Sequence, residues 1–351
     1  GRRRQQQWQC DGRRYGYTSC GASRWLGIMM FEPQAVAGQQ HHGDSVFPLV
    51  LVAEGPMSQQ DLHEQLVTLM EQLATHGAIL FRGCGVTDAQ AFDDFVAGFG
   101  LPNFAYDESL SNAVRHNRTP QVFTANEAPQ NVEIFLHHEM AQTPYFPSHL
   151  FFFCEQAAAA GGATPLCRSD VLLEKLTQHL PEFVGLCRAQ GARYSLTMPA
   201  EADATSGQGR SWRQTLNVDT KEAAEARLEA LEYDWQWLPD DAIRTTTPAL
   251  SLIRHAPSGN EVFFNQLIAA FCGWQDQRNE GTRSVTYGDG SAFDDADVQA
   301  AVEIAYDLVF DLPWESGDVA LIDNYRVMHG RRPFSGQRSV LASLCLDSAS
   351  A

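Results

Sequence analysis

Three candidate metal ligands, two of them close together and one distant, most constrain how this chain can fold. His137 and Glu139 are separated by one residue, and His329 lies far along the sequence. If residues 135–140 form a strand, His137 and Glu139 point to one side and His138 to the other, because side chains alternate between faces. Two histidines and a carboxylate with open positions suit ferrous iron and dioxygen. Because most isolated His-x-Glu pairs are ordinary surface or core residues, other features must support this interpretation.

The overall composition is that of a soluble globular protein and narrows the range of partners. Of 351 residues, 44% are hydrophobic and 19% are charged, which is enough for a full core. The net charge of -18 argues against binding to nucleic-acid phosphates. No apolar run is long enough to cross a bilayer or to form a signal peptide. The eight cysteines include no Cys-x-x-Cys pair, which favours a reducing cytoplasm over a disulfide scaffold or a structural zinc site.

The chain divides at about residue 45. Residues 1–45 are rich in arginine and glutamine and show little periodic hydrophobicity, so we expect a flexible leader there. A basic arm that docks on an acidic partner is the alternative for this leader. Residues 46–351 contain no internal repeat and no convincing boundary, so we expect them to form a single domain.

Hydrophobic periodicity predicts many short strands with helices grouped around them. Ser58 is expected to cap a helix that ends at Gly77, and Thr87 and Gln90 have capping-box spacing before a second helix. A continuous apolar run at 150–154 indicates a strand covered on both faces. Further strands are expected at 46–52, 78–81, 122–127, 135–140, 249–253, 261–265, 319–322 and 338–344, and further helices at 169–186, 220–231 and 295–310. This pattern favours an α+β fold with a double-stranded β-helix (jelly-roll) core and flanking helices.

Arg338 and Thr164 extend the candidate site beyond the metal ligands. A buried arginine on the last strand requires an anion, because an unpaired buried charge is costly, and its planar fork suits a carboxylate. Thr164 follows two glycines and is expected to add a hydroxyl to the same carboxylate. A metal triad beside these two residues is what a 2-oxoacid cosubstrate requires. Taken singly, Arg338 is more simply explained by a salt bridge, and Thr164 by a turn.

Two long motifs resemble the taurine- and clavaminate-type iron(II)/2-oxoglutarate dioxygenases. The first lies within Phe123–Asp170 and includes Phe-Leu-His-His-Glu-Met and Gly-Gly-Ala-Thr-Pro. The second, Gly317–Cys345, includes Gly-Asp-Val-Ala-Leu-Ile-Asp-Asn and His-Gly-Arg-Arg-Pro-Phe. The resemblance covers roughly residues 46–347. Two long motifs in the right order are far more specific than the His-x-Glu pair alone.

The resemblance implies that His137, Glu139 and His329 bind Fe(2+), with O2 as a cosubstrate. Glu139 stands where much of the family has aspartate, as in the clavaminate and amino-acid hydroxylase branch. Related halogenases place a small residue at this position so that chloride can bind the iron. A carboxylate here therefore favours hydroxylation, in which 2-oxoglutarate is decarboxylated to succinate while a C–H bond of the substrate is oxidised.

The resemblance also implies that Thr164 and Arg338 hold the far carboxylate of 2-oxoglutarate. In the family the distal arginine can lie at somewhat different spacings from the second histidine. Arg331 and Arg332 are therefore alternatives to Arg338. We favour Arg338, because it is expected to lie within the last strand.

The motif set is similar to a syringomycin-biosynthesis (SyrP-like) subgroup, whose members hydroxylate the β-carbon of an aspartyl residue attached to a peptide-synthetase carrier domain. The resemblance implies a small-molecule or carrier-bound amino acid as substrate, in antibiotic biosynthesis. An anionic substrate needs cations in the pocket, and Arg210 and Arg213, in an expected lid at 201–213, are candidates. Asn126 and Asn265 are further substrate-binding candidates. The alternative for all four is a solvated or structural role.

Two other functions remain open at this point. The same iron centre can end in desaturation or in the breakdown of a small acid, such as sulfonate cleavage, and only product analysis separates these outcomes. The third function is a non-catalytic jelly-roll module that binds another metal or none. Arg338 and Thr164 argue against such a module, because a structural metal does not need them.

Overall fold

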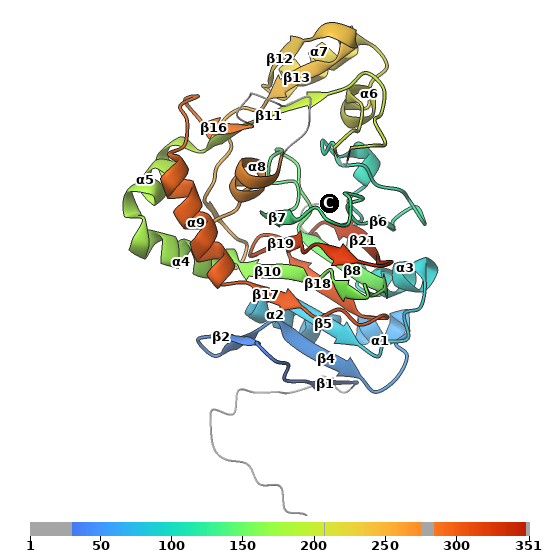
Figure 1. Cartoon of the computed structure of the whole chain (residues 1–351). Helices are drawn as coiled ribbons and strands as arrows, with labels where there is room; N and C mark the ends of the chain where they lie inside the picture. The colour runs from blue at the N-terminus through green and yellow to red at the C-terminus, as the bar shows by residue number, and fades with distance from the viewer. Residues whose placement is uncertain (1–29, 207, 275–283, 349–351) are drawn as a thin grey trace, which may run out of the picture.

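Two β-sheets face each other at the centre of the structure, and helices and a third sheet surround them (Figure 1). The computed structural model describes residues 30–206, 208–274 and 284–348. The seven-stranded sheet contains, in spatial order, β1 (Phe31–Pro33), β4 (Leu49–Ala53), β5 (Ala78–Arg82), β18 (Val319–Asp323), β8 (His149–Gln156), β21 (Ser339–Cys345) and β6 (Phe123–Thr124). The four-stranded sheet contains β17 (Phe310–Leu312), β10 (Thr164–Arg168), β19 (Val327–Arg331) and β7 (Ile134–His137). Every pair of neighbours is antiparallel except β4 and β5.

The sequence of β8 explains why the seven-stranded sheet is covered on both faces. Leu150 and Phe152 point into the core between the two sheets, where they meet side chains such as Val327 of β19. Phe151 and Phe153 alternate with them and pack on the other face, under helices. A strand buried on both sides needs a continuous apolar run, and the prediction of a strand at 150–154 is confirmed.

Helices cover the outer faces of both sheets. Helices α1, α2 and α3 lie on the seven-stranded sheet, and α4, α5, α8 and α9 lie on the four-stranded sheet. Their bounds are α1 (Gln59–Glu64), α2 (Leu66–His76), α3 (Ala89–Ala97), α4 (Ser169–His179), α5 (Pro181–Gln190), α8 (Leu267–Gly273) and α9 (Asp295–Asp307). Within the described ranges, no helix has the length and apolar character that crossing a membrane requires.

A third sheet forms an upper lobe with two helices (Figure 1). It contains β12 (Asp234–Trp237), β13 (Ile243–Thr246), β11 (Ala192–Met198) and β16 (Val285–Tyr287), and it packs with α6 (Trp212–Leu216) and α7 (Lys221–Ala230) around the fully buried Trp212. The remaining elements are the pairs β2 (Gln40–His42) with β3 (Ser45–Phe47), β9 (Ala160–Gly161) with β20 (Phe334–Ser335) and β14 (Arg254–His255) with β15 (Glu261–Val262), and the 3-10 turns η1 (Tyr106–Glu108) and η2 (Pro239–Asp241).

Regular structure begins earlier than the sequence predicted. Strands β1 and β2 fall within the expected flexible leader, and β1 adds an edge strand to the seven-stranded sheet by pairing with β4. Phe31 anchors this edge, because it is 4% exposed and its ring centroid lies 5.4 Å from that of Phe81. The leader prediction is therefore wrong for residues 30–45. Residues 1–29 lie outside the described part of the chain.

The first predicted helix has the expected ends but is broken in the middle. Ser58 caps α1 in a capping box, and Gly77 ends α2 in the left-handed conformation at φ 83°. Between them the chain leaves the helical path at Gln65, whose backbone N–H donates to Leu62 O over the shorter i−3 spacing. Two short helices with a common apolar side replace the single predicted helix.

Two other local predictions need correction. Asp88, rather than the predicted Thr87, caps α3 by accepting a hydrogen bond from Ala91 N. The predicted strand at 249–253 reduces to an isolated bridge, in which Leu250 exchanges two 2.8 Å backbone hydrogen bonds with Ala192. In both cases a tertiary or side-chain partner, which local periodicity does not reveal, determines the outcome.

Candidate metal centre and cosubstrate pocket

Strands β7 and β19 bring the two distant histidines together. His137 and His329 are direct cross-strand partners, and their ring centroids lie 4.3 Å apart. Their neighbours Leu136 and Met328 point outward to the helices, so alternation along each strand turns both imidazoles to the opposite, inner face. The two histidines therefore lie between the sheets, beside Phe152, whose ring centroid is 5.2 Å from that of His329.

Glu139 reaches the histidines from a turn, not from the predicted continuous strand. Strand β7 ends at His137, and Met140 has a positive φ of 56°. Asn324 holds this turn: Glu139 N donates to its side-chain oxygen at 2.8 Å, and its Nδ2 donates to Glu139 O at 3.1 Å. His329, predicted to lie just beyond a strand, instead lies within β19.

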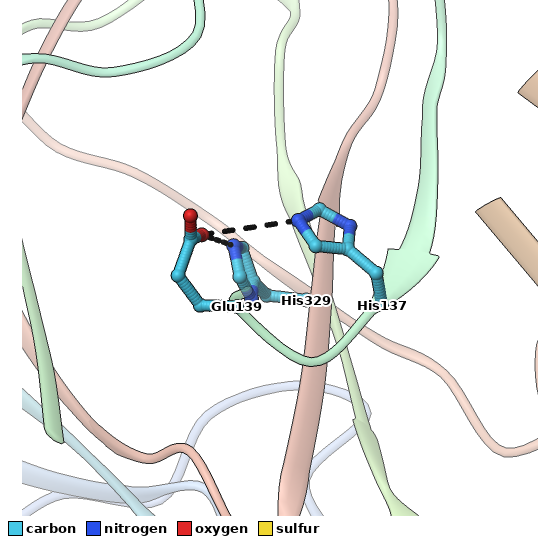
Figure 2. Close-up of side chains that lie close together, drawn as sticks. All are labelled: His137, Glu139 and His329. Atoms are coloured by element: carbon cyan, nitrogen blue, oxygen red, sulfur yellow. Dashed lines mark ion pairs between the residues drawn. The ribbon is translucent and has the colours of Figure 1, made fainter. Parts of the chain in front are cut away.

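The three side chains converge on one point (Figure 2). Glu139 Oε2 lies 3.9 Å from His137 Nε2 and 3.3 Å from His329 Nε2. One ligand atom from each residue lies within 4.8 Å of the others. Glu139 Oε2 is buried and has no hydrogen-bond partner in the described chain, although an unsatisfied buried carboxylate oxygen is costly. A cation between these three atoms would satisfy it, so the residues fit a bound metal ion.

The protonation states also suit metal binding. His137 Nδ1 lies 2.8 Å from Phe135 O, so it must carry the proton that it donates, which leaves the Nε2 lone pair facing Glu139. Burial and the neighbouring His329 lower the pKa of His137 to about 4, so its imidazole is neutral at neutral pH. Burial opposes ionisation of Glu139, but Arg115 and the two imidazoles outweigh it and hold the pKa of this carboxyl below its usual range.

A small cavity next to the triad contains both predicted cosubstrate residues. His137, His329, Thr164 and Arg338 all line it. Arg338 lies directly before β21 rather than within it, and its Nε donates to Gly162 O at 3.0 Å. In the described part of the chain no carboxylate forms an ion pair with Arg338, so the salt-bridge alternative fails.

The environment of Arg338 and Thr164 favours an anionic ligand. Burial and the nearby Arg331 lower the pKa of Arg338 to about 10, which shows that this cation lacks a compensating charge. Trp314 Nε1 donates to Thr164 Oγ1 at 2.8 Å. Because that bond uses an acceptor lone pair, the hydroxyl proton of Thr164 stays available to a ligand oxygen.

The two alternative arginines are already engaged by the protein. Arg331 donates to four backbone carbonyls of the segment 126–132, at 2.7 to 3.3 Å. Arg332 forms ion pairs with Glu133 at 3.1 Å and with Asp311 at 2.9 Å. Arg338 is therefore the arginine of the three that retains capacity for a carboxylate.

A larger cavity of about 500 Å³ opens on the other side of the triad. His137 and Glu139 line it, together with the amide side chains of Gln142 and Gln266. Asn126, a predicted substrate-binding residue, lines both this cavity and the smaller one, and its Oδ1 accepts from Ala128 N at 2.8 Å. The candidate metal site thus lies where two cavities meet, since His137 lines both of them.

The other three predicted substrate-binding residues have structural contacts instead. Arg210 donates to backbone carbonyls of residues 107, 109 and 111 at 2.8 to 3.0 Å. Arg213 stacks on Trp212 and donates to Ala200 O. Asn265 is fully buried and bonds to the backbone at Leu252 O and Leu267 N. None of the three lines the larger cavity, because local polar groups already satisfy them.

Sequence reasoning missed three residues that support the site. Arg115 Nη2 donates to Glu139 Oε1 at 2.9 Å, Asn324 holds the Glu139 backbone, and Trp314 orients Thr164. Arg115 lies in an irregular segment that shows no periodicity, so no sequence signal marked it. Asn324, a polar residue directly after the apolar strand β18 and five residues before His329, was the one detectable from its position.

His137, Glu139 and His329 could hold a metal ion, and comparison with known proteins gives the family. Residues 46–344 match the model of the taurine catabolism dioxygenase TauD, TfdA family. Because the match spans most of the chain, this protein belongs to that family. Its predicted resemblance to taurine- and clavaminate-type dioxygenases is thereby confirmed.

Individual relatives agree with this assignment. The chain is similar to a clavaminate synthase-like protein of Arabidopsis thaliana, with 37% identity over 318 residues, or 88% of this chain and 96% of the relative. It is similar to the dapdiamide synthesis protein DdaC of Enterobacter agglomerans, with 30% identity covering 78% of this chain and 83% of the relative. Its fold is similar to that of PvcB from Pseudomonas aeruginosa, with a TM-score of 0.51, 16% identity, and coverage of 86% and 87% of the two chains.

Proposed function

We propose that this protein is an iron(II)- and 2-oxoglutarate-dependent oxygenase that hydroxylates a C–H bond of an amino acid or of a carrier-bound aminoacyl group. One observation carries the proposal: Arg338, which has no acidic partner in the described chain, lines one small cavity with His137 and His329, and Glu139 Oε2 lies beside both of these histidines. A structural metal site does not need a buried arginine without an anion, whereas a carboxylate-bearing cosubstrate does. The facing sheets around this cavity support the interpretation of the core as a jelly roll.

The residues divide the work between holding the metal and orienting its ligands. His137 Nε2, His329 Nε2 and Glu139 Oε2 would hold Fe(II), which supplies the redox chemistry of dioxygen when bound. Arg338 and the Thr164 hydroxyl would bind the far carboxylate of 2-oxoglutarate, so that its other end points to the triad. Burial between two sheets excludes bulk water from this end of the site. PvcB, whose fold is similar to that of this chain, is an Fe, alpha-ketoglutarate dependent oxygenase from an isonitrile synthetic pathway.

The larger cavity supports a substrate of amino-acid size or a tethered equivalent. Its volume of about 500 Å³ falls in the range of ordinary small-molecule sites. Its lining is rich in amides and hydroxyls that can bond an amino group and a carbonyl, including Gln142, Gln266 and Asn126. The relative DdaC is a dapdiamide synthesis protein, which favours a biosynthetic over a catabolic role for this chain.

Turnover with defined substrates tests this function. The full chain, supplied with Fe(II), ascorbate, 2-oxoglutarate and O2, should form succinate in proportion to an added amino acid or aminoacyl carrier protein. Mass spectrometry should show a substrate gain of one oxygen atom. His329→Ala is the matched control, since it removes one metal ligand from a strand. A substrate loss of two hydrogens, or release of sulfite from a sulfonate, would replace hydroxylation by desaturation or small-acid breakdown.

A further inference from the structure

Arg115 is the one arginine among the described residues lining the larger cavity, and it contacts a metal ligand. Its Nη2 donates to Glu139 Oε1 at 2.9 Å, and both side chains are about 5% exposed. It also lines the smaller cavity, so it stands in the wall between the two. We propose that Arg115 is a positioning residue that keeps Glu139 to one-oxygen metal coordination and thereby keeps a coordination position open.

The two oxygens of Glu139 have different partners, which is the basis of this role. Oε1 is held by Arg115, whereas Oε2 has no hydrogen-bond partner in the described chain and faces both histidine Nε2 atoms. A free carboxylate can bind a metal through both oxygens, and a charge-assisted hydrogen bond on one of them opposes this. The contact therefore selects Oε2 as the single ligand atom.

Aromatic packing fixes Arg115 so that it can hold Oε1. Its guanidinium carbon lies 5.0 Å from the ring centroid of Tyr106 and 5.2 Å from that of Phe123. Its Nε and Nη1 are buried without hydrogen-bond partners in the described residues. The arginine thus packs against two rings whose centroids lie 5.2 Å apart, with the Glu139 carboxylate as its anionic partner.

The consequence concerns the open positions of the metal. This role rests on the proposed function, in which three protein atoms leave about three positions of an octahedral ion for the cosubstrate and dioxygen. If Glu139 bound through both oxygens, one of these positions would be lost. A residue that prevents this affects ligand access to the metal without itself touching the reacting atoms.

The test counts water molecules on a bound metal probe. Mn(II) alone is added to the full chain, its affinity is measured from the EPR signal of free Mn(II), and bound waters are counted by proton relaxation. The variants are Arg115→Gln and Arg115→Met; the latter keeps an apolar stem against the rings of Tyr106 and Phe123. Arg210→Gln is the matched control, because Arg210 is also buried over Tyr106, at 5.3 Å, but bonds only to groups outside the metal site.

We expect wild type and Arg210→Gln to hold Mn(II) with about three waters, and both Arg115 variants to bind Mn(II) with about two. The 2-oxoglutarate affinity of the Arg115 variants should fall along with the lost water. An unchanged water count in a folded Arg115 variant would overturn the role, and so would an equal loss in Arg210→Gln. Failure of the wild type to bind Mn(II) would instead overturn the proposed function on which the role depends.

Discussion

Arg338 and Arg210 are both largely removed from solvent, but they differ in how many hydrogen bonds they form within the protein. Arg210 donates to three backbone carbonyls in the segment 107–111, so the fold itself uses its guanidinium. Arg338 has one hydrogen bond within the described residues, to Gly162 O, and no acidic partner there. The guanidinium of Arg210 stabilises a loop, whereas in the proposed function that of Arg338 binds a ligand carboxylate.

This difference favours Arg338 over Arg210 as a ligand-binding arginine, because Arg338 has fewer partners within the protein and lines a cavity beside the histidines. Native structures satisfy nearly all of their buried polar groups, so each exception needs an explanation. Glu139 Oε2 is such an exception, and it lies beside the two histidines that line the small cavity with Arg338. In the sequence, both arginines were candidates for binding an anion: Arg338 for 2-oxoglutarate and Arg210 for the substrate.

Substitution of Arg338 should give the largest increase in the KM for 2-oxoglutarate. Removing one partner of a buried charge pair costs about 2–5 kcal/mol, and each 1.4 kcal/mol is tenfold, so Arg338→Gln should raise the KM for 2-oxoglutarate about 100-fold. Succinate formation against 2-oxoglutarate concentration measures this. Arg332→Gln, which removes a half-exposed arginine already paired with Asp311, is the control and should leave KM unchanged. A wild-type KM for 2-oxoglutarate in Arg338→Gln would contradict the distinction between Arg338 as a ligand-binding arginine and Arg210 as a structural one.

Substitution of Arg210 should affect stability instead of binding. Arg210→Gln leaves three backbone carbonyls without their donor, which should lower the free energy of unfolding by about 2 kcal/mol. Urea denaturation measures this loss. The KM for 2-oxoglutarate should stay within about twofold of the wild type. A large KM change with normal stability would mean that Arg210 belongs to the ligand site after all.

Substitution of Thr164 should raise the KM for 2-oxoglutarate less than substitution of Arg338 does. A hydrogen bond to a charged group contributes about 1.5–3 kcal/mol, so Thr164→Val should raise the KM for 2-oxoglutarate about tenfold. Thr164→Ser keeps the hydroxyl and should stay near the wild type. The same succinate assay compares the two variants. Equal KM values for serine and valine would remove Thr164 from the carboxylate site.

Trp314 should show the smallest effect. Its Nε1 donates to Thr164 Oγ1, so Trp314→Phe removes the bond that orients this hydroxyl while keeping an aromatic ring. Losing about 0.5 kcal/mol of orientation corresponds to a KM increase of about twofold. Combined with Thr164→Val, the substitution should add nothing further, because both act through one hydroxyl. Additive effects in the double variant would contradict this coupling.

The sequence predicted the parts of the molecule that repeat a local pattern. The apolar run of β8 and the caps at Ser58 and Gly77 depend on neighbours within a few residues, and all three are present. His137 and His329 could be paired because strands fix where alternate side chains point. Arg338 was chosen because it was expected within the last strand, whereas it lies directly before β21.

The failures concern contacts between segments distant in sequence. Arg115 reaches Glu139 from an irregular segment, and no periodicity signals such a contact. Arg210 was expected in the substrate pocket, because its sequence shows a charge but not the carbonyls that satisfy it. The predicted leader failed at β1, which pairs with β4 and forms the edge of a sheet whose strands come from distant parts of the sequence. Tertiary hydrogen bonds decided each of these cases.

The most direct test of the account is an anaerobic titration of the full chain with Fe(II) and 2-oxoglutarate, followed by visible absorption. The triad of His137, Glu139 and His329, with Arg338 beside it, predicts a weak charge-transfer band that requires both additions. The band should be missing from folded His329→Ala. A folded wild-type protein that shows no band with both components in excess would contradict the account.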